Sequence, residues 1–220
     1  MSSSVGSESS TATQGRRTTV LATKPLLGYR TIDLVSAAML GVAFGVVFWA
    51  WNLIYTGPSA ALDAIFPPLS ALLAGPWLLA GVVGGLLIRR PGAALLAELV
   101  AASVSALIGS QWGWTVLLSG ALQGLGVEVA LALFAWKQFG PRVAVLAGVL
   151  AATFEVVFYE WWQWVADYTW AWKLAYLGAF AVSGAIVAGL GGLALVRAVA
   201  KTGAVNAMPP GQEELDRSAH

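Results

Sequence analysis

The chain alternates between long apolar runs and short stretches that contain proline, glycine or charged residues. A helix needs about 20 mostly apolar residues to cross hydrocarbon about 30 Å thick, and the apolar runs are long enough for this. The breaks between them predict six spans near residues 31–55, 65–90, 92–110, 115–138, 141–165 and 171–200. The second span is expected to be kinked or divided into two pieces, because Pro67 and Pro68 open it and Pro76 lies inside it.

Composition supports this pattern. Of the 220 residues, 58% are hydrophobic and 10% are charged, whereas a soluble domain has about 45–50% apolar and about 25% charged residues. We therefore expect an all-α integral membrane protein, a six-helix bundle that passes several times through the plasma membrane. A net charge of +1 offers no basic surface for nucleic acid. Cysteine is absent and the single histidine, His220, is the last residue, so we expect neither a cofactor nor a metal site.

The basic residues predict the orientation of the bundle, because Lys and Arg resist translocation and accumulate in cytoplasmic connections. Six spans with both termini in the cytoplasm place 11 of the 12 basic residues on that side and only Lys173 outside. The transmembrane domain would then comprise residues 30–202, flanked by cytoplasmic tails at 1–29 and 203–220 that are both expected to be disordered. The basic residues assigned to the cytoplasm are Arg16, Arg17, Lys24, Arg30, Arg89, Arg90, Lys137, Arg142, Arg197, Lys201 and Arg217.

Tryptophan is distributed unevenly along this topology, since nine of the 11 fall at predicted extracellular ends of spans. One interpretation is an aromatic belt at the headgroup level, but belts normally occupy both interfaces. The other is a pocket that stacks a flat ring, whose aromatic walls would also attract a cation. Both interpretations remain open for individual rings. The nine are Trp49, Trp51, Trp112, Trp114, Trp161, Trp162, Trp164, Trp170 and Trp172.

Four glutamates fall inside predicted spans, where a charge costs about 2.5–3.5 kcal/mol, so each is a functional candidate. They are Glu98, Glu128, Glu155 and Glu160. Glu155 shares a helix face with aromatic rings and an amide, and the first, fourth and sixth spans carry similar side chains at a comparable outer depth. For each polar residue the alternative is a hydrogen bond between helices or, for a glutamate, a protonated side chain. The candidate substrate-binding residues are Trp49, Asn52, Gln123, Glu155, Tyr159, Trp162, Gln163, Trp172 and Tyr176.

Small residues recur every four positions in the cytoplasmic half of the first span, at Ala37, Gly41 and Gly45. We call these three residues the small-residue stripe. Such spacing lets another helix approach closely, either within the bundle or in a partner protein.

The sequence contains no G-x-x-x-x-G-K-[ST] loop, so a partner would have to hydrolyse ATP if the chain is part of a pump. One alternative is a stand-alone permease in which Glu98 or Glu128 carries protons. Another is an intramembrane acid/base enzyme that uses Glu155 and Glu160. However, five positions along an α-helix correspond to about 140° of rotation, which would direct these two carboxylates to different faces.

Three stretches of the chain, in this order, resemble the YkoE family of substrate-binding S components in energy-coupling factor (ECF) importers. They are TIDLVSAAMLGVAFGVVFWAWN (31–52), PPLSALLAGPWLLAGVVGGLLIRRPGAALLAELVAA (67–102) and FEVVFYEWWQW (154–164), and the resemblance covers about residues 30–200. It implies a six-helix subunit that binds thiamine or its hydroxymethylpyrimidine precursor on the extracellular side. Such a subunit then associates with a transmembrane coupling subunit and two cytoplasmic ATPase subunits.

The resemblance also implies roles for particular residues. The small-residue stripe is similar to the alanine-rich motif by which S components contact the coupling subunit, with glycine in place of alanine at two positions. Separately, the one-sided distribution of aromatic residues suggests the hypothesis that the outer loops around Trp112 and around Asp167, Tyr168 and Trp170 close over the ring while Glu155 balances its positive charge. Thiamine-type sites use stacking aromatic rings and a carboxylate, which this chain can supply from Trp49, Tyr159, Trp162, Trp172 and Glu155.

Overall fold

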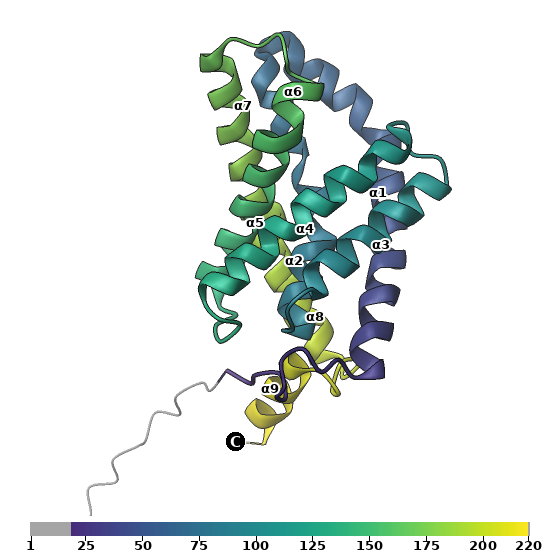
Figure 1. The fold of residues 1–220 in the computed structure, drawn as a ribbon, viewed down its shortest axis with the longest axis vertical. Helices are drawn as coiled ribbons and strands as arrows, with labels where there is room; N and C mark the ends of the chain where they lie inside the picture. The colour runs from purple at the N-terminus through teal and green to yellow at the C-terminus, as the bar shows by residue number, and fades with distance from the viewer. Residues whose placement is uncertain (1–18, 220) are drawn as a thin grey trace, which may run out of the picture.

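The computed structural model describes residues 19–219, and every element within that range is a helix (Figure 1). This confirms the predicted all-helical class. The elements are α1 (Thr31–Ile65), η1 (Pro67–Leu73), η2 (Gly75–Leu78), α2 (Leu79–Ile88), α3 (Ala93–Leu107), η3 (Gly113–Thr115), α4 (Val116–Leu133), α5 (Pro141–Glu155), η4 (Val156–Glu160), α6 (Trp161–Gln163), α7 (Trp170–Ser183), η5 (Gly184–Gly191), α8 (Gly192–Lys201) and α9 (Pro209–Ser218).

Four continuous helical segments are long and apolar enough to cross a membrane, namely Thr31–Ile65, Gly113–Leu133, Pro141–Gln163 and Trp170–Lys201. The bent unit from η1 to α2 makes a fifth candidate span. The remaining predicted span contains α3, an apolar helix of 15 residues, which is about 22 Å long at 1.5 Å per residue. Length and composition thus establish four to five candidate spans, and a sixth crossing by α3 stays a prediction.

The first helix, α1, is much longer than the predicted span at 31–55. It continues through Pro58 to Ile65 and comprises 35 residues, so that it is about 52 Å long, well beyond a hydrocarbon thickness of about 30 Å. It is therefore longer than a single crossing requires, and its C-terminal turns carry Asp63. This extension matters for the cavity described below.

The second span is broken, as the sequence predicted. The segment from Pro67 to Leu73 meets the segment from Gly75 to Ile88 at an angle of 42°. Side chains of other helices satisfy backbone groups at the break: Trp51 donates to the carbonyl oxygen of Leu73 at 3.0 Å. Ser183 donates to the carbonyl oxygen of Leu72 at 2.5 Å and accepts from the Gly75 amide at 2.9 Å. These bonds replace the helical ones that the break removes, which is how irregular backbone is tolerated at membrane depth.

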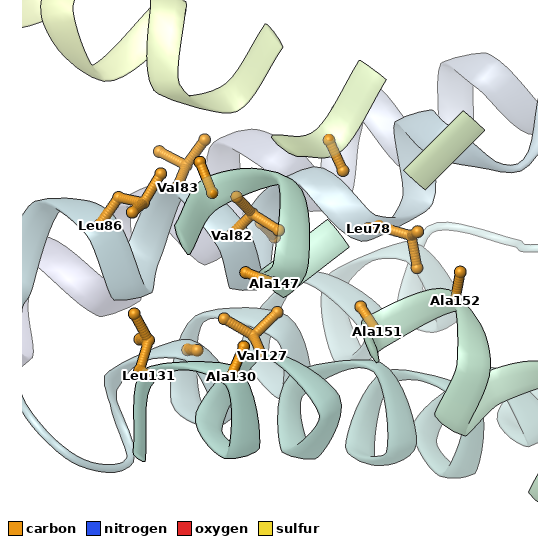
Figure 2. Close-up of a cluster of buried hydrophobic side chains, with 14 of the residues drawn as sticks. Leu78, Val82, Val83, Leu86, Val127, Ala130, Leu131, Ala147, Ala151 and Ala152 are labelled. Atoms are coloured by element: carbon orange, nitrogen blue, oxygen red, sulfur yellow. The ribbon is translucent and has the colours of Figure 1, made fainter. Parts of the chain in front are cut away.

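The helix that follows the break, α2, lies at the centre of the bundle. Nine of its ten residues are buried, as expected for a helix that is apolar on all sides. Figure 2 shows Val82 and Leu86 of α2 packed against Val127 and Leu131 of α4, with Ala147 of α5 beside them. The buried core is therefore built around α2.

The small-residue stripe packs inside the molecule, against α3. A Cβ atom built on Gly41 would lie 2.5 Å from Cβ of Val100, and one built on Gly45 would lie 2.5 Å from Cβ of Val104. Ala37 is fully buried. The expectation that these three residues form a surface for the coupling subunit is therefore wrong for this structure, because α3 already occupies the face that they offer.

We predict that Gly41→Val destabilises the protein by about 1–3 kcal/mol, since the added methyl groups would force α1 away from α3. The matched control is Gly57→Val in the same helix, where an added Cβ meets nothing within 4 Å. Thermal unfolding of the purified protein in detergent should show a lower midpoint for the first variant and a nearly unchanged one for the second. Equal midpoints would show that the contact between α1 and α3 is not tightly packed.

The described parts of both predicted tails are ordered, which corrects the expectation of disorder for 19–29 and 203–219. Arg90 is buried, pairs with Asp33 at 2.6 Å and donates to carbonyl oxygens in the segment 23–26. Arg89 pairs with Glu213 of α9 at 2.6 Å. Two buried arginines need partners, and these segments supply them. Residues 1–18 and 220 of the predicted tails lie outside the described range.

Candidate ligand-binding cavity

A cavity of about 270 Å³ opens in the half of the bundle remote from α9. Its walls come from the C-terminal half of α1, the broken second span, α3, η3, α4, the end of α5, η4, α7 and the loops that precede η3 and α7. Figure 1 shows how these helices are arranged. Small-molecule sites have volumes of about 300–1,000 Å³, so this cavity suits a small organic ligand.

The cavity is lined by four acidic side chains: Asp63, Glu98, Glu155 and Glu160. Among the lining residues that the structure describes there is no lysine, arginine or histidine. The wall therefore carries acceptors and potential negative charge without a cation to balance them. Such a cavity favours a ligand that is a cation or a hydrogen-bond donor.

Glu155 is held at one oxygen and open at the other. Ser119 donates to its Oε1 at 2.6 Å, and Gln123 donates to the Ser119 hydroxyl at 2.8 Å. Oε2 is buried and has no hydrogen-bond partner within residues 19–219. The hydroxyl of Tyr159, another lining residue, is also buried without a partner in that range. Buried polar atoms normally have partners, so these atoms indicate where a ligand would bind.

Glu160 faces the same cavity as Glu155, which corrects the expectation that the two carboxylates point to different faces. The segment Val156–Glu160 is a π-helix, in which hydrogen bonds join residues five apart instead of four. Residues at this spacing then lie above one another. The Tyr176 hydroxyl donates to Oε2 of Glu160 at 3.3 Å, so α7 fixes this second carboxylate.

Three aromatic rings from different elements form one wall. Tyr55 of α1, Trp77 of η2 and Trp112 of the loop before η3 contact each other edge to face, with centroid separations of 4.9, 5.1 and 5.7 Å. Asn52 accepts from the Trp77 indole at 2.8 Å and donates to Ser110 at 3.2 Å. The amide of Asn52 thus ties the break in the second span to the outer loop.

A second aromatic group lines the cavity from the loop before α7 and from α7 itself. Tyr168, from the loop between α6 and α7, lines the cavity and contacts Tyr176 at 6.3 Å and Trp172 at 5.4 Å between ring centroids. Burial, reinforced by the nearby Asp63 carboxylate, raises the pKa of Tyr168. Its hydroxyl therefore stays neutral at physiological pH and can donate a hydrogen bond.

The structure brings together five of the predicted site residues and leaves four outside. The lining residues are Asn52, Gln123, Glu155, Tyr159 and Tyr176. Trp49, Trp162, Gln163 and Trp172 do not line the cavity. Phe48 lies on the wall in place of Trp49, and the π-helix turns Trp164 towards the cavity in place of Trp162. The centroid of the Trp162 ring instead lies 5.3 Å from Nζ of Lys173. The Trp172 ring packs against the ring of Tyr168.

Sequence reasoning did not assign several lining residues to the site. Tyr55 and Asp63 lie in or beyond the last turns expected of the first span, and the length of α1 brings them to the cavity. Trp77 sits at the break, whose geometry a linear pattern does not give. Glu98 and Glu160 are ionisable residues inside predicted spans, where burying a charge costs free energy. That cost is the sequence signal that could have assigned them to the cavity.

The fold and the cavity define a class of protein: a helical membrane subunit that binds a small ligand and carries no phosphate-binding loop of its own in its sequence. Comparison with known proteins agrees. A family model described as the permease component of an ABC-type cobalt transport system matches residues 32–154. A solved structure, "Crystal structure of an S-component of ECF transporter", superposes with a TM-score of 0.79 at 29% identity and covers 87% of this chain and 95% of its own.

The chain is also similar to the Bacillus subtilis (strain 168) protein named "Putative HMP/thiamine permease protein YkoE". The two are 31% identical over 186 residues, which is 84% of this chain and 92% of the relative. The chain therefore belongs to the family of ECF transporter S components and is a YkoE-like member of it. It is a multi-pass membrane subunit of a transporter and not an enzyme.

Proposed function

We propose that this S component binds thiamine or its hydroxymethylpyrimidine (HMP) precursor in the acid-lined cavity. It then associates with an ECF transmembrane coupling subunit and two cytoplasmic ATPase subunits, which hydrolyse ATP to drive import. The observation that carries the proposal is a cavity with four acidic residues, aromatic walls and no basic lining residue in the described part of the chain. The HMP/thiamine name of the Bacillus subtilis relative supports the choice of ligand.

The chemistry of thiamine fits these walls. Its thiazolium ring carries a fixed positive charge, which a buried carboxylate such as Glu155 can balance. Its two flat rings can pack against Tyr55, Trp77 and Trp112, whose faces also attract cations. The cobalt named in the family description fits less well. Within residues 19–219 no three His, Cys, Asp or Glu side chains lie close enough to hold a metal ion.

We propose six membrane crossings with both termini in the cytoplasm. The distribution of basic residues supports this topology. The arrangement of the helices supports it too, because α9 and the described start of the chain lie at the end of the bundle opposite the cavity (Figure 1). The cavity then opens to the extracellular side, where the vitamin arrives. Since the small-residue stripe is internal, docking to the coupling subunit would use other parts of the surface.

The topology can be tested by single-cysteine labelling, because the natural chain has no cysteine. Ala166 and Ala204 are exposed residues in loops at opposite ends of the bundle. A membrane-impermeant maleimide added to intact cells should label Ala166→Cys and should leave Ala204→Cys unlabelled until the membrane is permeabilised. Labelling of Ala204→Cys in intact cells would contradict the proposed orientation.

The ligand can be tested by titrating the intrinsic tryptophan fluorescence, because Trp77, Trp112 and Trp164 line the cavity. We expect a saturable change with thiamine and with HMP, and none with riboflavin or biotin. A saturable response to riboflavin or biotin, or no response to either pyrimidine, would overturn the proposal.

A further inference from the structure

Glu98 is, with Glu155, one of the two most buried acidic residues of the cavity. It lies on α3, is 1% exposed and lines the cavity wall. A Cβ atom built on Gly124 of α4 would contact its Cβ at 3.3 Å, so two helices enclose it. Asp63 and Glu160, in contrast, lie near helix ends beside the outer loops. Glu98 therefore marks the closed end of the cavity, and the other two acids mark the side towards the mouth.

The two carboxylate oxygens of Glu98 are in different situations. Oε2 accepts from the amide of Gly81, in the first turn of α2, at 2.5 Å. This contact depends on glycine, since a Cβ on Gly81 would lie 2.9 Å from the same oxygen. Oε1 is buried and has no partner among residues 19–219. One oxygen is thus fixed by the helix that follows the break, which leaves the other as a rigidly held acceptor for a ligand.

Thiamine and HMP share one part and differ in another. Both contain an aminopyrimidine ring with an exocyclic amino group, but only thiamine carries the thiazolium cation. A site that accepts both must recognise the shared part where the cavity is closed, because an enclosed acceptor strongly rejects a ligand that leaves it unpaired. The part that differs can then occupy the mouth, beside Glu160.

We infer that Glu98 is the residue that recognises the shared group: its Oε1 accepts a hydrogen bond from the exocyclic amino group of the pyrimidine. The inference rests on the proposed function and deepens it, since it orients the ligand with the pyrimidine inward and the cationic ring outward. Glu98 then determines the affinity for every ligand that carries the aminopyrimidine ring. Glu160 affects the affinity only for thiamine, the ligand that also carries a positive charge.

The experiment compares Glu98→Gln, Glu160→Gln and Glu128→Gln with the natural protein, using titrations with thiamine, HMP and an HMP analogue that lacks the amino group. Glu128 is the matched control. Its Oε1 accepts hydrogen bonds from the amides of Ala94 and Leu95 at the start of α3, just as Glu98 accepts one from an amide at the start of α2. Unlike Glu98, Glu128 does not line the cavity. Size-exclusion chromatography and thermal unfolding, both in detergent, test whether each variant is folded.

Glu98→Gln should weaken the binding of thiamine and HMP by the same factor, about 10- to 100-fold, and leave the amino-free analogue almost unchanged. Glu160→Gln should weaken thiamine more than HMP, and Glu128→Gln should change neither. If Glu98→Gln binds HMP as well as the natural protein does, or loses all three ligands equally, the inference is wrong while the proposed function stands. If the natural protein binds neither pyrimidine, the proposed function fails and this inference fails with it.

Discussion

Replacing Glu155 with glutamine is expected to weaken thiamine binding by about 30-fold or more. Glu155 is 1% exposed, and its Oε2 is the carboxylate oxygen that has no partner in the described part of the chain. Removing one member of a buried charge pair costs about 2–5 kcal/mol, and each 1.4 kcal/mol is a factor of ten in affinity. Glutamine keeps the volume and still accepts from Ser119, so the change removes charge and little else. Fluorescence titration measures the dissociation constant.

HMP provides the internal control for this prediction, because it carries no fixed positive charge. The loss of affinity for HMP should be clearly smaller than the loss for thiamine. Equal affinity of Glu155→Gln and the natural protein for thiamine would remove Glu155 from the ligand site. An equal loss for both ligands would show that Glu155 shapes the cavity without balancing the charge.

A second large effect is expected at the opposite end of the bundle. Asp33→Ala should lower the free energy of unfolding by about 3–5 kcal/mol, because Arg90, which is 1% exposed, would lose the carboxylate that neutralises it. The same change removes the partner of Arg30, which lies 2.7 Å from Asp33. Thermal or denaturant unfolding in detergent should show the loss directly.

The control is the double variant Asp33→Ala with Arg90→Leu. Replacing both members of a buried pair by apolar side chains is often nearly neutral, so the double variant should recover much of the stability lost by Asp33→Ala alone. A double variant as unstable as the single one would show that the uncompensated charge on Arg90 is not the cause. The instability would then come from the contacts of Asp33 with Arg30 or from the hydrogen bonds that Arg90 donates to the segment 23–26.

The sequence predicted those parts of the fold that depend on one segment at a time. Apolar length marked the membrane helices, and Pro67, Pro68 and Pro76 predicted the broken second span that the structure shows. Spacing alone left two readings for the small-residue stripe, because it does not show which helix meets Gly41 and Gly45. That information lies in Val100 and Val104 of α3, which are ordinary apolar residues in the sequence.

The site was harder to predict, because its walls combine segments whose local geometry departs from regular helices. Asn52 and Glu155 were identified, since a polar side chain at membrane depth is a strong signal. The pairing of Glu155 with Glu160 depends on the π-helix between them, and a projection with α-helical rotation hides it. Trp77 reaches the cavity only because the second span bends beside it.

The ends of the chain were also misjudged for a physical reason. The polar composition of 203–219 predicts disorder for an isolated segment, but Glu213 of α9 pairs with Arg89 and accepts from the Val20 amide at 2.8 Å. Arg89 in turn lies over the ring of Phe139 at 4.5 Å. These partners are distant in the sequence, so local composition carries no trace of them.

The central claim is that the acid-lined cavity holds a flat, cationic aminopyrimidine vitamin. An experimental structure of the purified protein with thiamine tests it most directly. The account predicts ligand density between Glu155 and the rings of Tyr55, Trp77 and Trp112, with the pyrimidine amino group at Glu98 and the thiazolium ring towards Glu160. Thiamine bound elsewhere on the protein, with this cavity filled by side chains, would contradict it.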